Sequence, residues 1–368
     1  MTVESDLSLK PGDVIGILGG GQLGRMLAIA AAQLGLKTTT FTPDANAPAT
    51  DVSKFQIIAD YNDQKALKRF ADHINVATYE FENIPLETLY SLETFGTSVF
   101  PNIEALKITQ DRLLEKTFLT EHSIPVAPFF SIGTLDDLEK AAVTSGMPAI
   151  LKTRRFGYDG KGQVRLERNS VLETAFDAIA QQEAVLEAFI GFEKEISVVA
   201  ARGRDGSFQH YDLSENIHHN QILYQSFVPT DIPAPISELA YDITRKIADA
   251  LNFIGVFAVE FFYCGMTSEQ PLIVNEIAPR VHNTGHWTLE ACCVNQFENH
   301  IRAVAGWPIG QTHRHSDAVM TNLLGADVMK WSGLLSDQTV KLHLYGKSDV
   351  KADRKMGHFT KILEKTGR

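Results

Sequence analysis

The sequence predicts a protein of the α/β and α+β classes, with an N-terminal parallel-sheet domain, a larger mixed domain and a small β-rich C-terminal domain. The chain has 368 residues, which is long for one hydrophobic core. Strand-like and helix-like segments alternate at its start, as in a parallel sheet. Mixed strands and helices begin at Val126, and short strands predominate from Gly306. We therefore predict three domains, at residues 1–107, 108–305 and 306–368.

Composition and charge exclude several classes of protein. The net charge of −11 argues against a nucleic-acid-binding protein, because neutralising phosphates normally requires a basic surface. No apolar run approaches the ~18 residues of a membrane span, and the polar, acidic start is unlike a signal peptide. The cysteines, Cys264, Cys292 and Cys293, form no disulfide framework, which indicates free thiols. We expect a cytoplasmic protein that binds neither nucleic acid nor membranes.

The first element is a strand at Val14–Leu18, followed by the turn GGGQLG, a helix and a second strand, LKTTTF. Gly19, Gly21 and Gly24 match the G-x-G-x-x-G pattern of a Rossmann-like dinucleotide site. A nicotinamide enzyme would also need an acidic residue at the end of the second strand, and Asp44 lies beyond that end. Two alternatives stay open: another anionic ligand at the helix N-terminus, or glycines that serve only the turn and close packing.

Two further strands are predicted at FQIIA and VATYEF, and the second of them ends in acidic residues. Glu80 and Glu82 are two apart, so they fall on one face of the strand end. A helix around Ile108–Glu121 then marks the start of the middle domain. The helix predicted near Ser170–Gln182 belongs to this middle domain as well.

A glycine-rich stretch, RRFGYDGKGQ at residues 154–163, has the composition of a phosphate-binding loop. A P-loop would need a hydroxyl residue after its glycine and lysine and a helix thereafter, but Gln163 follows Gly162. The flanking segments PAILKTRR and QVRLER both alternate like strands. The stretch is therefore predicted to be the tip of a β-hairpin, and a plain surface hairpin is the alternative to a phosphate site.

Two glutamates stand inside the apolar strands VFAVEFF and LIVNEIAP. A short connection joins these strands, so antiparallel pairing would place Glu260 and Glu276 on one face. Buried carboxylates need a partner, and neither strand carries a basic residue. Mg²⁺ ions that bridge nucleotide phosphates would provide that partner.

Just beyond, the segment APRVHNTGHWT contains Arg280 and His282, which should point the same way from an extended chain. Arginine beside a magnesium–phosphate site suits a planar anion such as a carboxylate or carbonate. His282 and His286 have the spacing of a zinc pair on a helix, but the residues between them are poor helix formers.

Five motifs in this order, GGGQLGRM, YEFEN, GYDGKGQ, EAFIGFEKE and NEIAPRVHNTGHWT, resemble the ATP-grasp superfamily. More narrowly, the chain resembles the N5-carboxyaminoimidazole ribonucleotide synthases of purine biosynthesis, from Gly16 to about Lys361. The resemblance implies an ATP-grasp fold with a Rossmann-like N-terminal domain. It implies an ATP-dependent ligase that carboxylates 5-aminoimidazole ribonucleotide with bicarbonate by way of carboxyphosphate. It also implies a homodimer. ATP and two Mg²⁺ ions are the cofactors implied.

The resemblance also implies roles for individual residues. The hairpin would be a lid over the ATP phosphates, and it comprises Gly157, Tyr158, Asp159, Gly160, Lys161, Gly162 and Gln163. The other nucleotide contacts implied are Arg112, Lys152, the hinge Glu187, Ala188, Phe189 and Ile190, the ribose ligand Glu195, His218 (or its neighbour His219), Asn275 and Glu276. The metal ligands implied are Glu260 and Glu276, and the catalytic residues implied are Arg280 and His282, which would hold bicarbonate, and Asp159.

The ribonucleotide substrate would be bound from both ends of the chain. The contacts implied are Gly21, Gln22, Leu23, Glu80, Glu82, Tyr158, Lys347, Arg354 and Lys355. The last three would converge on the 5′-phosphate, and a solvated basic patch in a C-terminal tail is the alternative.

Other functions stay open at this point. A formate-activating ATP-grasp enzyme acting on a related purine intermediate is the alternative within the superfamily. A nicotinamide oxidoreductase and a catalytically inactive nucleotide-binding regulator are alternatives of other classes. The apolar stretch LEACCVNQFENHIRAVAGW is open too, since it suits either a subunit interface or a core helix.

Overall fold

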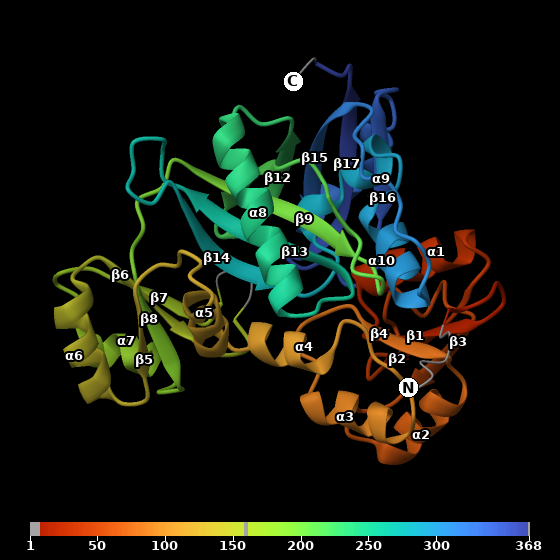
Figure 1. Cartoon of the computed structure of the whole chain (residues 1–368), viewed down its shortest axis with the longest axis horizontal. Coiled ribbons are helices and arrows are strands. Elements are labelled where there is room, and N and C mark those ends of the chain that lie inside the picture. Colours follow the sequence, from red (N-terminus) through yellow and green to blue (C-terminus); the bar gives the residue numbers. More distant parts are fainter. Residues whose placement is uncertain (1–7, 158–160, 367–368) are drawn as a thin grey trace.

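The computed structural model describes residues 8–157 and 161–366, which form three β-sheets with helices around them (Figure 1). The N-terminal sheet is parallel in the order β3-β2-β1-β4. Its strands are β1 (Val14–Leu18), β2 (Lys37–Thr42), β3 (Phe55–Ile58) and β4 (Val76–Tyr79). The parallel sheet that the alternating pattern predicted is confirmed, including both later strands.

Four helices belong to this part: α1 (Gln22–Gln33), α2 (Gln64–Asp72), α3 (Leu86–Thr94) and α4 (Ile103–Thr109). The single helix expected around Ile108–Glu121 is wrong in one respect, because α4 ends and a separate helix, α5 (Arg112–Glu121), begins. Asp111 causes the break, since its carboxylate accepts hydrogen bonds from the Leu113 and Leu114 N–H groups and so caps a new helix.

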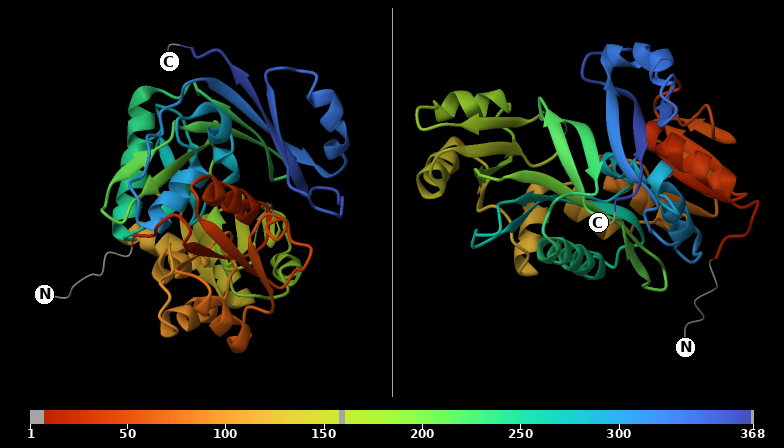
Figure 2. Two further views of the ribbon diagram at one scale, coloured as in Figure 1. Left: turned by 90° about the vertical axis from the view of Figure 1, so that its right-hand side faces the viewer. Right: turned by 90° about the horizontal axis from the view of Figure 1, so that it is seen from above.

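A small antiparallel sheet in the order β5-β8-β6-β7 lies at the end of the molecule opposite the N-terminal domain (Figure 2). Its strands are β5 (Phe129–Ile132), β6 (Ala149–Thr153), β7 (Gln163–Leu166) and β8 (Ala184–Ala188). Helices α6 (Leu135–Ser145) and α7 (Leu172–Ala178) pack on it. The helix expected near Ser170–Gln182 is shorter than predicted, because Ala180 and Gln181 adopt positive φ angles of 55° and 54°.

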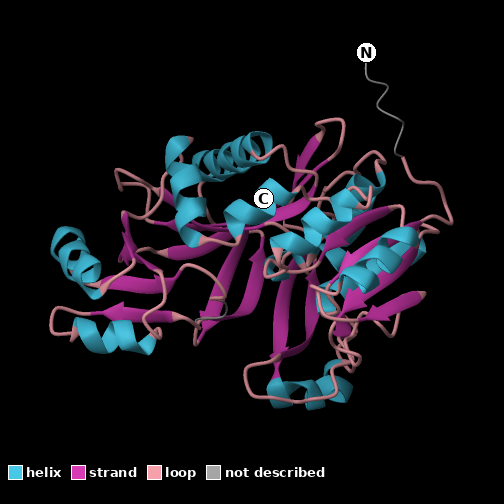
Figure 3. Ribbon diagram, turned by 90° about the horizontal axis from the view of Figure 1, so that it is seen from below, coloured by secondary structure: helices cyan, strands magenta, loops and turns pink. Residues whose placement is uncertain are grey.

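The largest sheet has nine strands, mostly in the order β14-β13-β9-β11-β12-β15-β17-β16, with β10 paired to β9. Figure 3 shows its strands running through the middle of the molecule. The strands are β9 (Lys194–Arg202), β10 (Phe208–His210), β11 (Ser214–His219), β12 (Ile222–Val228), β13 (Gly255–Tyr263), β14 (Leu272–Ala278), β15 (Asp317–Leu324), β16 (Val340–Leu344) and β17 (Lys355–Leu363). The predicted C-terminal hairpin is β16–β17, and its sheet is continuous with the central one through the β12–β15 pair.

The remaining helices are α8 (Ala234–Ala250), α9 (Thr288–Ala291), α10 (Gln296–Ala305) and α11 (Trp331–Leu334). Two 3₁₀ turns, η1 (Asn283–Gly285) and η2 (Gly325–Lys330), lie between them. No helix in the described part of the chain has the length and apolar character of a membrane span. The apolar stretch left open above forms the core helix α10. Phe297, Ile301 and Val304 are fully buried there, in one core cluster with residues of β1, α1 and β13.

His300 on α10 joins the N-terminal sheet to the central sheet. Its Nδ1 accepts a hydrogen bond from the Val256 N–H at 3.1 Å, and its Nε2 lies 2.8 Å from the Thr78 hydroxyl. Because Nδ1 is the acceptor, the proton is on Nε2 and the ring is neutral. The two domains therefore meet across a buried side chain with a defined protonation state.

Candidate active site

One cleft of about 1250 Å³ collects nearly all the residues that the sequence singled out. The N-terminal domain, the small sheet, the central sheet and the C-terminal strands all contribute to its walls. The predicted residues that line it are Gly21, Gln22, Leu23, Glu80, Glu82, Arg112, Lys152, Gly157, Lys161, Gln163, Glu187, Ala188, Phe189, Ile190, Glu195, His218, Glu260, Asn275, Glu276, Arg280, His282, Lys347, Arg354 and Lys355. Tyr158, Asp159 and Gly160 lie outside the described residues, and Gly162 stands just off the lining.

The two strand glutamates face each other at the floor of this cleft. Glu260 on β13 and Glu276 on β14 are partners in the antiparallel pair that the short connection predicted, and a β-bulge between Glu260 and Phe261 sets this register. Burial, followed by the Glu276 charge, raises the pKa of Glu260 to about 7. The basic neighbours come from other elements: Arg112 Nη1 lies 3.5 Å from Glu276, and His282 Nε2 lies 3.5 Å from Glu260. Two carboxylates, one with 17% and the other with 37% of its side chain exposed, therefore share one wall with only loose pairing.

The strands β6 and β7, which flank the glycine-rich stretch, pair as an antiparallel hairpin, as predicted. Gly162 has a φ of +71°, and a Cβ there would lie 2.5 Å from the Thr153 hydroxyl. The Thr153 N–H also donates to the Gly162 carbonyl at 2.8 Å. Glycine is required at this position, because a side chain would be strained and would clash. Lys152, which pairs with Gln163 at the end of the hairpin next to the glycine-rich stretch, lines the cleft from β6.

Glu187, in the predicted hinge, has a buried carboxylate, and this burial was not predicted. Its Oε2 atom lies 3.0 Å from Lys152 Nζ and 3.3 Å from Lys116 Nζ. Burial by itself would raise the pKa of Glu187, but Lys116 and then Lys152 lower it to about 2. Next to Lys116, the Glu115 carboxylate accepts a hydrogen bond of 2.6 Å from the Ile277 N–H. Burial raises the pKa of Glu115 to about 8.

Glu115 and Lys116 were missed because consecutive charges on a helix are typical of a solvated face. Arg112, Glu115 and Lys116 occupy positions i, i+3 and i+4 of α5, so they share one side of it. That spacing, directly after a predicted nucleotide contact, was the signal that could have found them.

The two histidines between which the nucleotide contact was left open differ in their surroundings. His218 lines the cleft and forms an ion pair with Glu195, the predicted ribose ligand. Burial opposes protonation of the imidazole, but the Glu195 carboxylate outweighs it and raises the pKa of His218. His219 points elsewhere, and its ring stacks on Tyr224 with the centroids 4.4 Å apart.

Arg280 bridges two domains at the cleft. Its Nε donates to Glu82 Oε2 at 2.5 Å, and its Nη1 donates to the Val281 carbonyl at 3.2 Å. Burial would raise the pKa of Glu82, but the Arg280 charge lowers it instead. The Arg280 guanidinium therefore meets a carboxylate that was predicted to contact substrate.

His282 brings a neutral imidazole to the cleft, since burial and the Arg280 charge hold its pKa well below the usual range. Its Nδ1 lies 2.9 Å from the Thr284 hydroxyl. His286 follows the η1 turn, and its Nδ1 lies 3.1 Å from the Gln296 amide nitrogen. Among the described residues there is no group of three or more His, Cys, Asp or Glu side chains placed to hold a metal.

The helix N-terminus after the GGGQLG turn is occupied by a carboxylate of the chain itself. Glu80 accepts hydrogen bonds from the Gly21 N–H at 2.5 Å and the Gly24 N–H at 3.0 Å. A Cβ at Gly19 or Gly21 would lie 2.5–2.7 Å from this side chain. A phosphate at this helix end would meet the Glu80 carboxylate, so the structure favours the alternative in which the glycines serve the turn and close packing. The glycines serve the close approach of Glu80.

The C-terminal basic residues belong to the cleft and not to a solvated tail. Lys347 Nζ donates to the Lys355 carbonyl at 2.7 Å, which ties the loop after β16 to the start of β17. Arg354 Nη1 donates to the Asp349 carbonyl at 3.1 Å. All three side chains line the same cleft as Glu82 and Arg280.

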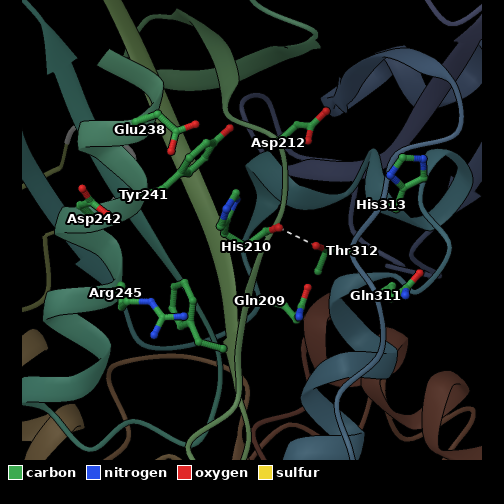
Figure 4. A pocket seen from close by; sticks show the side chains of 11 residues that line it. Gln209, His210, Asp212, Glu238, Tyr241, Asp242, Arg245, Gln311, Thr312 and His313 are labelled. Atoms are coloured by element: carbon green, nitrogen blue, oxygen red, sulfur yellow. Dashed lines mark hydrogen bonds between the residues drawn. The ribbon is translucent and has the colours of Figure 1, made fainter. Parts of the chain in front are cut away.

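A second pocket of about 840 Å³ lies between α8, β10 and residues 311–313 (Figure 4). His210 and Tyr241 stack there with their centroids 3.7 Å apart. Carboxylates at Asp212, Glu238 and Asp242 line it, and they would repel a triphosphate. None of the predicted site residues that the structure describes lines this pocket, so the larger cleft is the candidate active site.

Three family models match the chain in sequence order. Residues 13–110 match the ribonucleotide synthetase preATP-grasp domain, residues 117–297 match the ATP-grasp domain, and residues 318–368 match the phosphoribosylaminoimidazole carboxylase C-terminal domain. The matches extend over most of the chain and include most of the residues that line the cleft.

Individual relatives agree with these models. The chain is 48% identical over 363 residues to an N5-carboxyaminoimidazole ribonucleotide synthase of Brucella melitensis, covering 98% of this chain and 99% of that protein. A crystal structure of N5-carboxyaminoimidazole synthetase from Staphylococcus aureus with ADP has a TM-score of 0.92 at 40% identity, covering 97% and 95%. The synthase of Aspergillus clavatus with ADP and 5-aminoimidazole ribonucleotide has a TM-score of 0.89 at 27% identity, covering 96% and 94%.

Proposed function

The chain belongs to the N5-carboxyaminoimidazole ribonucleotide synthase family of ATP-grasp ligases, and we propose how its cleft performs the reaction of that family. The protein carboxylates 5-aminoimidazole ribonucleotide at the expense of ATP in purine biosynthesis. We propose bicarbonate as the source of the carboxyl group. The observation that carries the assignment of roles is the convergence of the glycine hairpin, the Glu260–Glu276 pair and Arg280 on one cleft.

Mg²⁺ fits the paired glutamates. Both are oxygen donors on adjacent strands, and Mg²⁺ prefers oxygen ligands together with substrate phosphates. The raised pKa of Glu260 marks a site where an added cation would relieve the repulsion between the carboxylates. We propose that Glu260 and Glu276 hold up to two Mg²⁺ ions, which would neutralise phosphate charge. Asn275 adjoins this site on β14.

The nucleotide is proposed to lie between the small sheet and the central sheet. Lys152 and Arg112 reach the phosphates, the hinge at Glu187–Ile190 meets the adenine, and Glu195 with His218 meets the ribose. The hairpin that contains Gly157 and Gln163 is proposed to cover the phosphates. Tyr158 and Asp159, which lie outside the described residues, remain proposed contacts of the ribonucleotide. Closure would exclude water, and carboxyphosphate is an intermediate that water destroys.

Bicarbonate is a poor electrophile, so it must first be activated. Its oxygen attacks the γ-phosphorus of ATP, ADP leaves, and carboxyphosphate forms. The exocyclic amine of the ribonucleotide then attacks the carboxyl carbon, or CO₂ released from it, and phosphate leaves as the amine loses a proton. Arg280 would hold the carboxylate edge of bicarbonate and stabilise the developing charge. His282, being neutral, contributes hydrogen bonding and not charge.

The ribonucleotide is proposed to enter between the N-terminal and C-terminal parts of the cleft. Lys347, Arg354 and Lys355 would hold its 5′-phosphate, because they place positive groups on one wall. Residues 21–23 and Glu82 would contact the sugar and base. Glu80, which caps α1, would act mainly by shaping this wall.

We also propose a cytoplasmic homodimer, as the family resemblance implies. The free cysteines Cys264, Cys292 and Cys293 suit a reducing compartment. Sedimentation equilibrium of the purified chain measures the assembly, and a monomer at micromolar concentration would contradict the dimer.

The decisive experiment measures ADP release by the purified protein with Mg²⁺-ATP, adding or omitting bicarbonate and 5-aminoimidazole ribonucleotide. We expect strong release only when both are present, with carboxylated ribonucleotide formed in equal amount. Release driven by formate with a related ribonucleotide would replace the substrate assignment. ATP binding without turnover under every combination would mean an inactive nucleotide-binding protein.

A further inference from the structure

Lys116 is a buried lysine on α5 that has no role in the proposed reaction. Only 1% of its side chain is exposed, and it is not among the described residues that line the cleft. A lysine in such a place is costly to bury unless a partner compensates its charge. Its partner is the equally buried Glu187, with Nζ 3.3 Å from the carboxylate.

The same carboxylate oxygen also meets Lys152, at 3.0 Å. Two ammonium groups therefore share one carboxylate, and they differ in how far they are exposed to the cleft. Lys152 is 12% exposed and lines the cleft, so it can turn toward a ligand, whereas Lys116 is held on α5 inside the protein. Helix α5 packs against β8, the strand that carries Glu187, which holds the Lys116–Glu187 contact in place (Figure 1).

When Lys152 turns to bind phosphate, it moves away from the Glu187 carboxylate. If Lys152 were the sole cation beside Glu187, its movement to a phosphate would strand a buried negative charge. With Lys116 present, the carboxylate keeps a cation whichever way Lys152 points.

We propose that Lys116 is a positioning residue for the nucleotide, a permanent counter-ion of Glu187 that leaves the Lys152 ammonium available to the phosphates of ATP. This inference rests on the proposed assignment of Lys152 to phosphate. It concerns binding and not chemistry, so it can be tested without turnover.

The test compares the binding of ADP and of adenosine, which has no phosphate, by calorimetry. Lys116→Met is expected to weaken ADP binding by about 30- to 100-fold and adenosine binding by less than about 3-fold. Lys107→Met, at an exposed lysine paired with Glu104 on α4, is the matched control and should change neither. Equal weakening of ADP and adenosine would overturn the proposal, because it would indicate a general loss of the hinge structure.

Two double variants locate the effect. In a Glu187→Gln background, Lys116→Met should weaken ADP binding by less than about 3-fold, since the charge that it compensates is gone. In a Lys152→Met background it should again add little. Full additivity in both backgrounds would overturn the proposal. If Lys116→Met does not fold, Lys116→Gln in the same backgrounds gives the same comparison.

These outcomes are separate from the fate of the proposed function. Failure of ribonucleotide-dependent ADP release would refute the assigned reaction and leave the binding comparison standing. An ADP affinity that Lys152→Met does not change would refute the phosphate role of Lys152, and with it this inference.

Discussion

His300 links the N-terminal and central sheets, and its protonation should control the stability of the protein in mildly acidic solution. The ring is fully buried, and burial lowers the pKa of His300 to about 4. In the unfolded chain the imidazole titrates near its ordinary value of about 6.5. The folded state therefore binds fewer protons than the unfolded state, and stability falls as pH drops below about 6.5.

The size of the effect follows from the two pKa values. Between pH 8 and pH 5, His300 should cost the folded state about 2 kcal/mol, since one pKa unit corresponds to about 1.4 kcal/mol. The perturbation is His300→Gln, whose amide can still donate toward Thr78 but does not titrate. At pH 8 the wild type should be the more stable protein, and its advantage should shrink by about 2 kcal/mol at pH 5.

Urea unfolding at intervals from pH 8 to pH 5 measures this difference. Far-UV circular dichroism and tryptophan fluorescence must give coincident transitions for the free energies to be meaningful. Buried His286 and His358 and the carboxylates titrate in both proteins, so they cancel in the comparison. A stability gap that stays constant from pH 8 to pH 5 would refute the reasoning.

Three further predictions concern the cleft. Arg280→Ala should lower kcat by about 10²- to 10³-fold with ADP affinity unchanged, because one donor to the developing charge is lost; a parallel loss of ADP affinity in calorimetry would contradict this role. Glu276→Gln should raise the half-saturating Mg²⁺ concentration for ADP release by at least about 10-fold, and an unchanged Mg²⁺ requirement would argue against the metal site. Glu80→Ala should lower the free energy of unfolding in urea by about 1–2 kcal/mol, because the Gly21 and Gly24 N–H groups lose their cap; a stability equal to wild type would rule that cap out.

Local pattern was enough to predict the elements of the cleft. The glycine stretch between two alternating segments predicted a hairpin, and the short connection between β13 and β14 predicted their antiparallel pairing. The exact pairing of Glu260 with Glu276 depends on a β-bulge that the sequence pattern did not predict. The alternation at the N-terminus predicted the parallel sheet. These features depend on neighbours along the chain, which is the information that sequence periodicity contains.

Pairings between distant segments were decided only by the tertiary structure. From the sequence alone, Lys116 is typical of a solvated helix residue, but in the structure β8 places Glu187 beside it. The GGGQLG turn is typical of an anion site, but in the structure the Glu80 carboxylate, just after β4, occupies it. The sequence by itself predicted most of the charged residues that line the cleft and most of the strands and helices that hold them. Packing decided which residue pairs with each buried charge, because charge pairing depends on distance in space. Such a pairing produces no periodic pattern in the sequence.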